Sequence, residues 1–174
     1  VVDSMKAFDP ARYAPINWNN PMPERPIPDE VKNSIFKFLP QYEVGLFWDM
    51  LIDLACLLKS DSEMNPIRDY GPIKLFLTGW SQSTSYVVRM VRSFAKECRT
   101  LFDGYLNGGG SGAVRLAPIN NAHPSGIGST EPHSDLLGTP QPFIAVNTES
   151  ENTRAFWYGD FDEPEFKFRT WQIA

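Results

Sequence analysis

The sequence contains little cysteine and no excess of basic residues, and both shortages exclude classes of protein. Two cysteines, Cys56 and Cys98, are too few for a disulfide scaffold or a zinc site. The 16 Lys and Arg residues stand against 21 Asp and Glu residues, which gives a formal net charge of -5. This acidity gives no support to a nucleic-acid partner, which would need a basic surface.

Long hydrophobic runs are also missing. The longest apolar stretch, around 46–58, is interrupted by Asp49 and Asp53 and is too short to span a bilayer. The first four residues lack the basic start and the apolar run of a secretory signal. The chain begins with Val1 instead of Met, and we therefore expect a processed or truncated product.

The composition is that of one folded domain with long irregular segments. The chain has 174 residues, of which 42% are hydrophobic and 21% charged, so it is neither disordered nor fibrous. The 15 prolines, 12 glycines and 13% aromatic residues indicate loops around an aromatic-rich core. Prolines predict a wrapping loop over 1–40, and a mixture of glycine and proline predicts a second loop over 103–140.

The remaining segments predict the alternation of helix and strand that is typical of α/β proteins. Helical spacing of apolar residues predicts a helix over 43–58. The apolar run 73–78 predicts a buried strand, and a second helical pattern then extends to about Cys98. Two more strands are predicted over 142–147 and 166–173. This order favours a mostly parallel sheet flanked by helices.

A serine stands at the junction between the predicted strand and the second helix. The segment Gly79-Trp80-Ser81-Gln82-Ser83 has small residues two before and two after Ser81, as a nucleophile elbow requires. Such a turn exposes the hydroxyl at the sheet edge and lets the backbone N–H of Gln82 donate to an oxyanion. The alternative is that Ser81 only caps the helix. We favour the catalytic interpretation because a strand precedes the serine and an amphipathic helix follows it.

The acid and the base of a triad should follow the serine in the chain. Glu149 and Glu151 come directly after the predicted strand 142–147, and we favour Glu151 because it lies further past the strand end. The alternative for either is a solvated loop carboxylate. The two histidines, His123 and His133, both precede this acid, and we interpret them as surface residues in the Gly/Pro-rich loop. The alternative is a base displaced from the usual chain order, for which His133 is the better candidate.

Several motifs together resemble the "alpha/beta hydrolase domain" family of poorly characterised, esterase-like proteins. The resemblance extends over nearly the whole chain, and the Gly-x-Ser-Gln-Ser elbow is its most specific part. It is carried by the segments 3–15, 79–83, 102–106, 146–151 and 168–174. It implies an α/β-hydrolase fold, present here as a single partial domain. Within it, 43–98 supplies helix, strand, elbow and helix, and 141–174 supplies the late strands and the acid loop.

The resemblance also implies site residues. The elbow serine of the family corresponds to Ser81, and the acid of its Thr-Glu-x-acid segment corresponds to Glu151, where Glu replaces the family's Asp. Family members continue past the Ile-Ala segment with a short turn and a histidine, and they are longer on the N-terminal side. We therefore expect the catalytic histidine and the second oxyanion donor to lie outside this chain.

The sequence thus predicts a serine hydrolase that cleaves a small carboxylic ester without a metal or an organic cofactor. Trp80, Trp157 and Tyr158 are candidates for the substrate pocket, with ordinary packing as the alternative for each. A non-catalytic interaction subunit is the competing hypothesis, and a cysteine enzyme based on Cys56 or Cys98 is a weaker third. Because few strands are predicted, we also expect additional polypeptide, from the same precursor or a second copy, to complete the domain.

Overall fold

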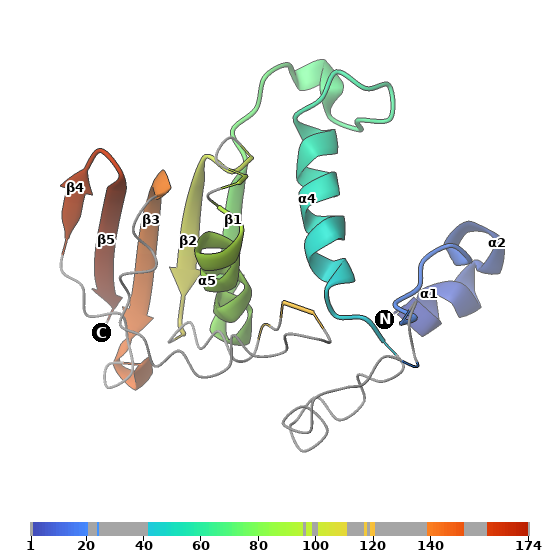
Figure 1. Ribbon diagram of the computed structural model, residues 1–174, viewed down its shortest axis with the longest axis horizontal. Coiled ribbons are helices and arrows are strands. Elements are labelled where there is room, and N and C mark those ends of the chain that lie inside the picture. The colour runs from blue at the N-terminus through green and yellow to red at the C-terminus, as the bar shows by residue number, and fades with distance from the viewer. Residues whose placement is uncertain are drawn as a thin grey trace.

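The computed structural model describes residues 2–20, 24, 42–95, 97–98, 101–110, 117, 119–120, 139–151 and 160–173. Its centre is a five-stranded sheet in the order β1-β2-β3-β5-β4 (Figure 1). The strands are β1 (Phe76–Trp80), β2 (Gly104–Gly108), β3 (Thr139–Thr148), β4 (Phe161–Glu163) and β5 (Phe166–Ile173). The first four strands in this order run parallel, and β4 alone is antiparallel to its neighbour β5. The predicted α/β class with a mostly parallel sheet is confirmed.

Two helices flank the strand that leads to Ser81. Helix α5 (Thr84–Ser93) lies against one face of β1 and β2, and seven of its ten residues are buried (Figure 1). Helix α4 (Leu46–Leu58) stands beyond β1 and joins the core through Trp48, which is 2% exposed. The Trp48 ring centroid lies 5.6 Å from that of Tyr86 and 5.0 Å from that of Phe94. Aromatic packing therefore fixes α4 to α5.

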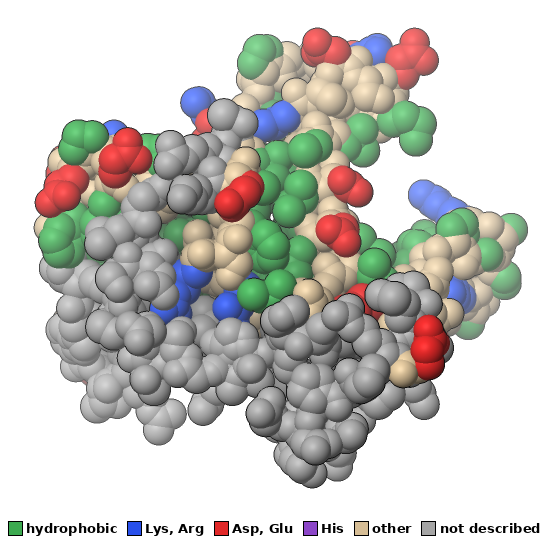
Figure 2. All heavy atoms as spheres, in the orientation of Figure 1, with side chains coloured by type: hydrophobic (Ala, Val, Ile, Leu, Met, Phe, Trp, Pro, Cys, Tyr) green, Lys and Arg blue, Asp and Glu red, His purple; other side chains and the backbone are tan. Residues whose placement is uncertain are grey.

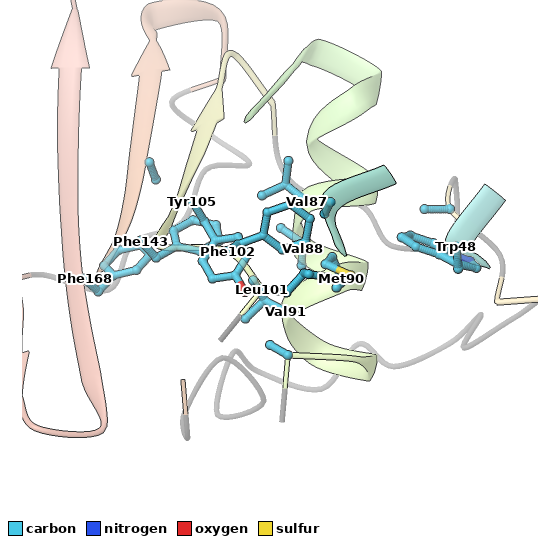
Figure 3. Close-up of a cluster of buried hydrophobic side chains, with 14 of the residues drawn as sticks. Trp48, Val87, Val88, Met90, Val91, Leu101, Phe102, Tyr105, Phe143 and Phe168 are labelled. Atoms are coloured by element: carbon cyan, nitrogen blue, oxygen red, sulfur yellow. The ribbon is translucent and has the colours of Figure 1, made fainter. Parts of the chain in front are cut away.

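The core on the α5 face is built from side chains in register across four strands. Leu77, Tyr105, Phe143 and Phe168 occupy one level of β1, β2, β3 and β5. The rings of Tyr105 and Phe143 stack at 6.2 Å, and those of Phe143 and Phe168 at 5.5 Å (Figure 3). The next level toward the carboxyl ends holds Gly79, Asn107, Ala145 and Thr170. The buried face therefore changes from aromatic to small and polar side chains as the strands approach the elbow.

The opposite face of the sheet is largely open. Phe76, Trp80, Trp171 and Ile173 are each more than half exposed, and Leu106 and Ile144 are partly exposed. These residues alternate with the buried ones because successive side chains of a strand point to opposite faces. Parallel sheets are normally covered on both faces. This exposed apolar face is therefore unusual for a parallel sheet.

The predicted N-terminal wrapping loop is wrong for its first part. Residues Val2–Phe8 form helix α1 and Pro10–Tyr13 form helix α2. Pro10 stands at the start of α2, where a missing N–H costs nothing, and the Asp9 side chain accepts a hydrogen bond from the backbone N–H of Arg12 at 3.0 Å. Phe8 is 86% exposed, so its side chain does not pack on the core.

Several other boundaries differ from the prediction. Strand β2 falls inside the segment 103–140, which we predicted to be a loop. Strand β1 begins at Phe76 and extends to Trp80, so two elbow residues belong to the strand. Helix α5 ends at Ser93, short of Cys98, and β4 was not predicted. The remaining short elements are the 3-10 helices Arg68–Tyr70, Ser81–Ser83 and Glu149–Glu151.

Asp103 fastens the amino ends of β1 and β2 to α4. Its carboxylate accepts from Lys59 at 2.8 Å, from Lys74 at 3.1 Å and from the backbone N–H of Leu75 at 2.8 Å. The hydrogen bonds from Lys59 and Leu75 are the main causes that lower the pKa of Asp103 to about 2. The carboxylate is thus ionised in the fold over a wider pH range than in the unfolded chain.

We expect Asp103→Asn to lower the free energy of unfolding by about 1 kcal/mol, because solvent still screens these contacts. In the wild type this stabilisation should be present above the ordinary carboxyl pKa near 3.8 and be lost as the pH falls toward 2. Urea unfolding of the two proteins between pH 7 and pH 2.5 measures both effects. Asp69→Asn, at an exposed carboxylate 3.7 Å from Arg68, is the matched control. Equal stability of the Asp103→Asn variant and the wild-type protein at pH 7 would contradict the assignment.

Candidate active site

The backbone of Ser81 is strained. Its φ of 54° is the only positive value among the described residues other than glycine. A non-glycine residue in the left-handed region costs about 1–2 kcal/mol, so the surrounding structure has to enforce it. Ser81 directly follows β1 and begins a 3-10 turn that leads into α5, and its side chain is exposed. This is the geometry that a nucleophile elbow uses to present a hydroxyl.

Gly79 makes the sharp turn possible. A Cβ at this position would lie 2.6 Å from the carbonyl oxygen of Ser83 and 2.8 Å from Cγ2 of Val87. Both contacts are shorter than real side chains allow, so only glycine fits where the strand and the helix meet. Ser83 itself has helical φ and ψ of -65° and -19° and an exposed side chain. The position two residues after Ser81 therefore tolerates Ser in place of Gly.

Thr84 and Gly110 complete the packing around the elbow. The hydroxyl of Thr84, which is 1% exposed, donates a hydrogen bond to the carbonyl oxygen of Ser81 at 2.6 Å. Gly110 approaches the same carbonyl so closely that a Cβ there would lie 2.7 Å from the Ser81 oxygen. The carbonyl of the strained residue is thereby fixed from two sides. We did not single out either residue from the sequence.

The expected oxyanion donor belongs to the first turn after the serine. Gln82 lies in the 3-10 helix Ser81–Ser83, just before α5. The first N–H groups of a helical segment have no partner within it and carry partial positive charge. Gln82 therefore lies in the first turn after Ser81, as the expected oxyanion donor requires.

Trp80 lies on the open face of the sheet. Its ring packs over Gly108 and Gly109, at the end of β2. A Cβ on Gly108 would lie 2.6 Å from Cζ3 of the Trp80 ring, and a Cβ on Gly109 would lie 3.0 Å from Cε2 of the same ring. Gly109 also has a positive φ of 60° and donates its N–H to Val146 at 2.8 Å. Two glycines inside the segment 103–140, which we predicted to be a loop, therefore pack against the residue that precedes Ser81. Trp80 remains 62% exposed.

The pairing register brings the serine and the acidic turn to the same edge of the sheet. Trp80 pairs with Gly108, Gly108 with Val146, and Thr148 with Ile173. Ser81 follows β1 and the turn Glu149–Glu151 follows β3, with only the end of β2 between them. Since neighbouring strands are about 4.8 Å apart, two strand spacings separate the two segments. An imidazole between the serine and the acid fits such a separation.

Glu151 is held in place by its own turn. The Thr148 backbone N–H donates to Oε2 at 2.9 Å, the Thr148 hydroxyl donates to the same oxygen, and the Ser150 hydroxyl donates to Oε1 at 2.8 Å. These bonds, the Thr148 hydroxyl first, lower the pKa of Glu151. The Thr148-x-x-Glu151 pattern matches a capping box, a signal that the sequence offered and that we did not use. Glu149, by contrast, is exposed and has no such bonds within the described residues.

Of the remaining candidates, the structure describes only the two cysteines. Trp157, Tyr158, His123 and His133 lie outside the described residues. Cys56 is exposed on α4, and burial is the largest cause that raises the pKa of the Cys98 thiol. A raised pKa disfavours the thiolate that a cysteine nucleophile needs.

The comparison with protein families decides the classification. The family model described as "Alpha/beta hydrolase domain" matches residues 1–174. The chain belongs to the alpha/beta hydrolase domain family. No curated protein and no solved structure matched it. Within the described part of this alpha/beta hydrolase domain, no helix is long and apolar enough to cross a membrane.

Proposed function

We propose that this alpha/beta hydrolase domain carries the nucleophile and the acid of a serine esterase. The observation that supports the proposal most is the strained Ser81 backbone directly after β1, with Gly79 packed beneath it. Strain of this kind persists where a rigid neighbourhood holds a functional residue in place. A helix cap requires no positive φ, so the capping alternative leaves the strain without a purpose.

The reaction proceeds by acyl transfer. The Ser81 oxygen attacks the carbonyl carbon of a small carboxylic ester while its proton passes to a histidine. The N–H of Gln82 donates to the oxyanion that forms. The alcohol leaves with the proton from the histidine, and a water molecule then releases the acid by the same steps. Glu151 orients the histidine, which we propose to come from outside this chain. Trp80, Trp157 and Tyr158 remain candidates for the substrate pocket.

A fluorophosphonate probe tests the proposal directly. We expect it to label the whole protein at Ser81, because the probe reacts with serines activated by a base. Peptide mass spectrometry identifies the labelled residue. Labelling should persist in Ser83→Ala, which removes an exposed hydroxyl two residues away, and disappear in Ser81→Ala. Failure of the whole protein to react at Ser81 would overturn the proposal and favour a non-catalytic interaction subunit.

We expect Glu151→Gln to lower kcat by at least about 100-fold, because loss of the orienting carboxylate leaves the imidazole misdirected. In this variant one carboxylate oxygen becomes an NH2 group, which cannot accept a hydrogen bond, so at least one of the bonds from Thr148 and Ser150 is lost. Glu149→Gln, at an exposed neighbour on the same turn, should change kcat less than about threefold. Steady-state kinetics on a short p-nitrophenyl ester compares the two. A larger loss in Glu149→Gln would move the acid by two residues.

We further propose that additional polypeptide, from the same precursor or a second copy, covers the open parts of the domain. Among the described residues no strand pairs with the outer edge of β1. The open sheet face carries Trp80 and Trp171, and α4 exposes Met50 and Leu54. Hydrophobic side chains are also in view beside α4 in Figure 2. An uncovered apolar surface and a free strand edge favour association. Sedimentation of the isolated chain should show self-association or aggregation, and a stable monomer would contradict this proposal.

A further inference from the structure

Two buried asparagines on neighbouring strands have unsatisfied side chains. Asn107 on β2 and Asn147 on β3 are each 1% exposed. Neither the amide nitrogen nor the amide oxygen of either residue has a hydrogen-bond partner among the described residues. The hydroxyl oxygen of Thr170 on β5 is buried and unpartnered in the same way. These five polar atoms are unusual because nearly all buried polar groups in proteins are paired.

The register places the three side chains in one cluster. Asn107 and Thr170 both stand at the level of Ala145, to either side of β3. Asn147 is two residues further along β3, on the same face, and so is a diagonal neighbour of both. Diagonal neighbours in a sheet are about 7–8 Å apart at the backbone. One small molecule between the side chains can reach all three strands.

The surroundings determine the chemistry of that molecule. Each amide both donates and accepts, and so does a threonine hydroxyl. The neighbouring positions in these levels are Gly79, Ala145 and Gln172, and none of them carries a charge. A charged ligand would have no counter-charge in these levels, whereas water both donates and accepts and is small enough. Buried water commonly satisfies groups of this kind.

We propose that Asn107, Asn147 and Thr170 bind buried water that links β2, β3 and β5 beneath the carboxyl edge of the sheet. Asn147 directly precedes Thr148, whose N–H and hydroxyl hold Glu151. The water would therefore also fix the strand end from which the acid projects, and this last role rests on the proposed function. The water site itself is independent of it.

The change in stability on replacing each asparagine by leucine distinguishes amides that are hydrogen-bonded to water from amides that have no partner. If water bridges them, Asn107→Leu and Asn147→Leu should each lower the folding equilibrium constant of the whole protein by about five- to thirtyfold. The double variant should lose less than the product of the two single losses, because both remove the same bridge. If the amides are orphaned, leucine removes an unsatisfied group and raises stability, which would overturn the proposal. Lys167→Leu, on the exposed side of β5, controls for the preference of leucine in strands.

Water is detected without any variant. In the wild-type protein, NMR should show cross-peaks between long-lived water and the side-chain amide protons of Asn107 and Asn147. Thr170→Val, which is close to isosteric, should weaken these cross-peaks, whereas Lys167→Leu, on the exposed side of β5, should leave them unchanged. Absence of bound-water signals at both amides, or direct amide-to-amide contacts in their place, would refute the water site whether or not the protein is an esterase.

Discussion

Ser81→Ala should abolish ester hydrolysis by the whole protein, with kcat reduced at least about a thousandfold. The substitution removes the attacking oxygen, and loss of a triad nucleophile typically costs several orders of magnitude in kcat. The fold should survive, because the side chain is exposed and the Thr84 hydrogen bond goes to the Ser81 backbone carbonyl, which alanine retains. Hydrolysis of a short p-nitrophenyl ester measures the loss.

Two control measurements test this interpretation. Ser83→Ala should keep nearly full activity, since Ser83 shares the turn but lacks the strained backbone. The free energy of unfolding of Ser81→Ala should stay within about 0.5 kcal/mol of wild type, as for other exposed substitutions. Activity above a tenth of the wild-type value in Ser81→Ala would disprove the nucleophile assignment.

Gly79→Ala should destabilise the fold by about 3 kcal/mol or more and abolish probe labelling. The added methyl would collide with the backbone carbonyl of Ser83 and with Val87, which is 1% exposed. Backbone atoms and a buried β-branched side chain cannot move aside cheaply, so β1 and α5 have to separate. The elbow would then lose its sharp turn together with the strain at Ser81.

Chemical denaturation and fluorophosphonate labelling of the same preparations measure both consequences. Gly71→Ala is a useful control: Gly71 also sits at a positive φ, of 73°, but a Cβ there meets nothing within 4 Å. Its cost should be limited to backbone strain of about 1–3 kcal/mol, because φ of 73° with ψ of -160° is a conformation that other residues rarely adopt. If Gly79→Ala is no worse than Gly71→Ala, the close approach of helix and strand does not constrain the elbow.

The elements with strong periodicity were predictable, and those with unusual turn chemistry were not. Helix α4 and strand β5 agree with the prediction because their apolar patterns match a helical and a strand period. Strand β2, with the sequence Gly-Tyr-Leu-Asn-Gly, escaped prediction because glycine and asparagine are rare in strands. Its glycines serve close packing against Phe76 and Trp80, a tertiary requirement that the local sequence does not reveal.

The site was predictable in part, for a related reason. The small residues around Ser81 indicated an elbow because they are a local steric requirement. Gly110 contributes through close packing against a segment far apart in the chain, and Thr84 through a hydrogen bond that depends on the conformation of the turn. Glu151 was favoured from its position past the strand and from the family resemblance, whereas the structure adds the Thr148 and Ser150 bonds that hold it.

The close packing of Gly108, Gly109 and Gly110 against Trp80 and Ser81 constrains how this chain can vary. A larger residue at 108 or 109 would need a smaller one at 80, and a side chain at 110 would have to move the Ser81 carbonyl. The effects of mutations in 80–81 and in 108–110 therefore depend on one another, although the two segments are nearly thirty positions apart in the chain. Substitutions in one segment should be tolerated only on particular backgrounds of the other, so combined variants of 80 and 108 should show epistasis that neither single change reveals.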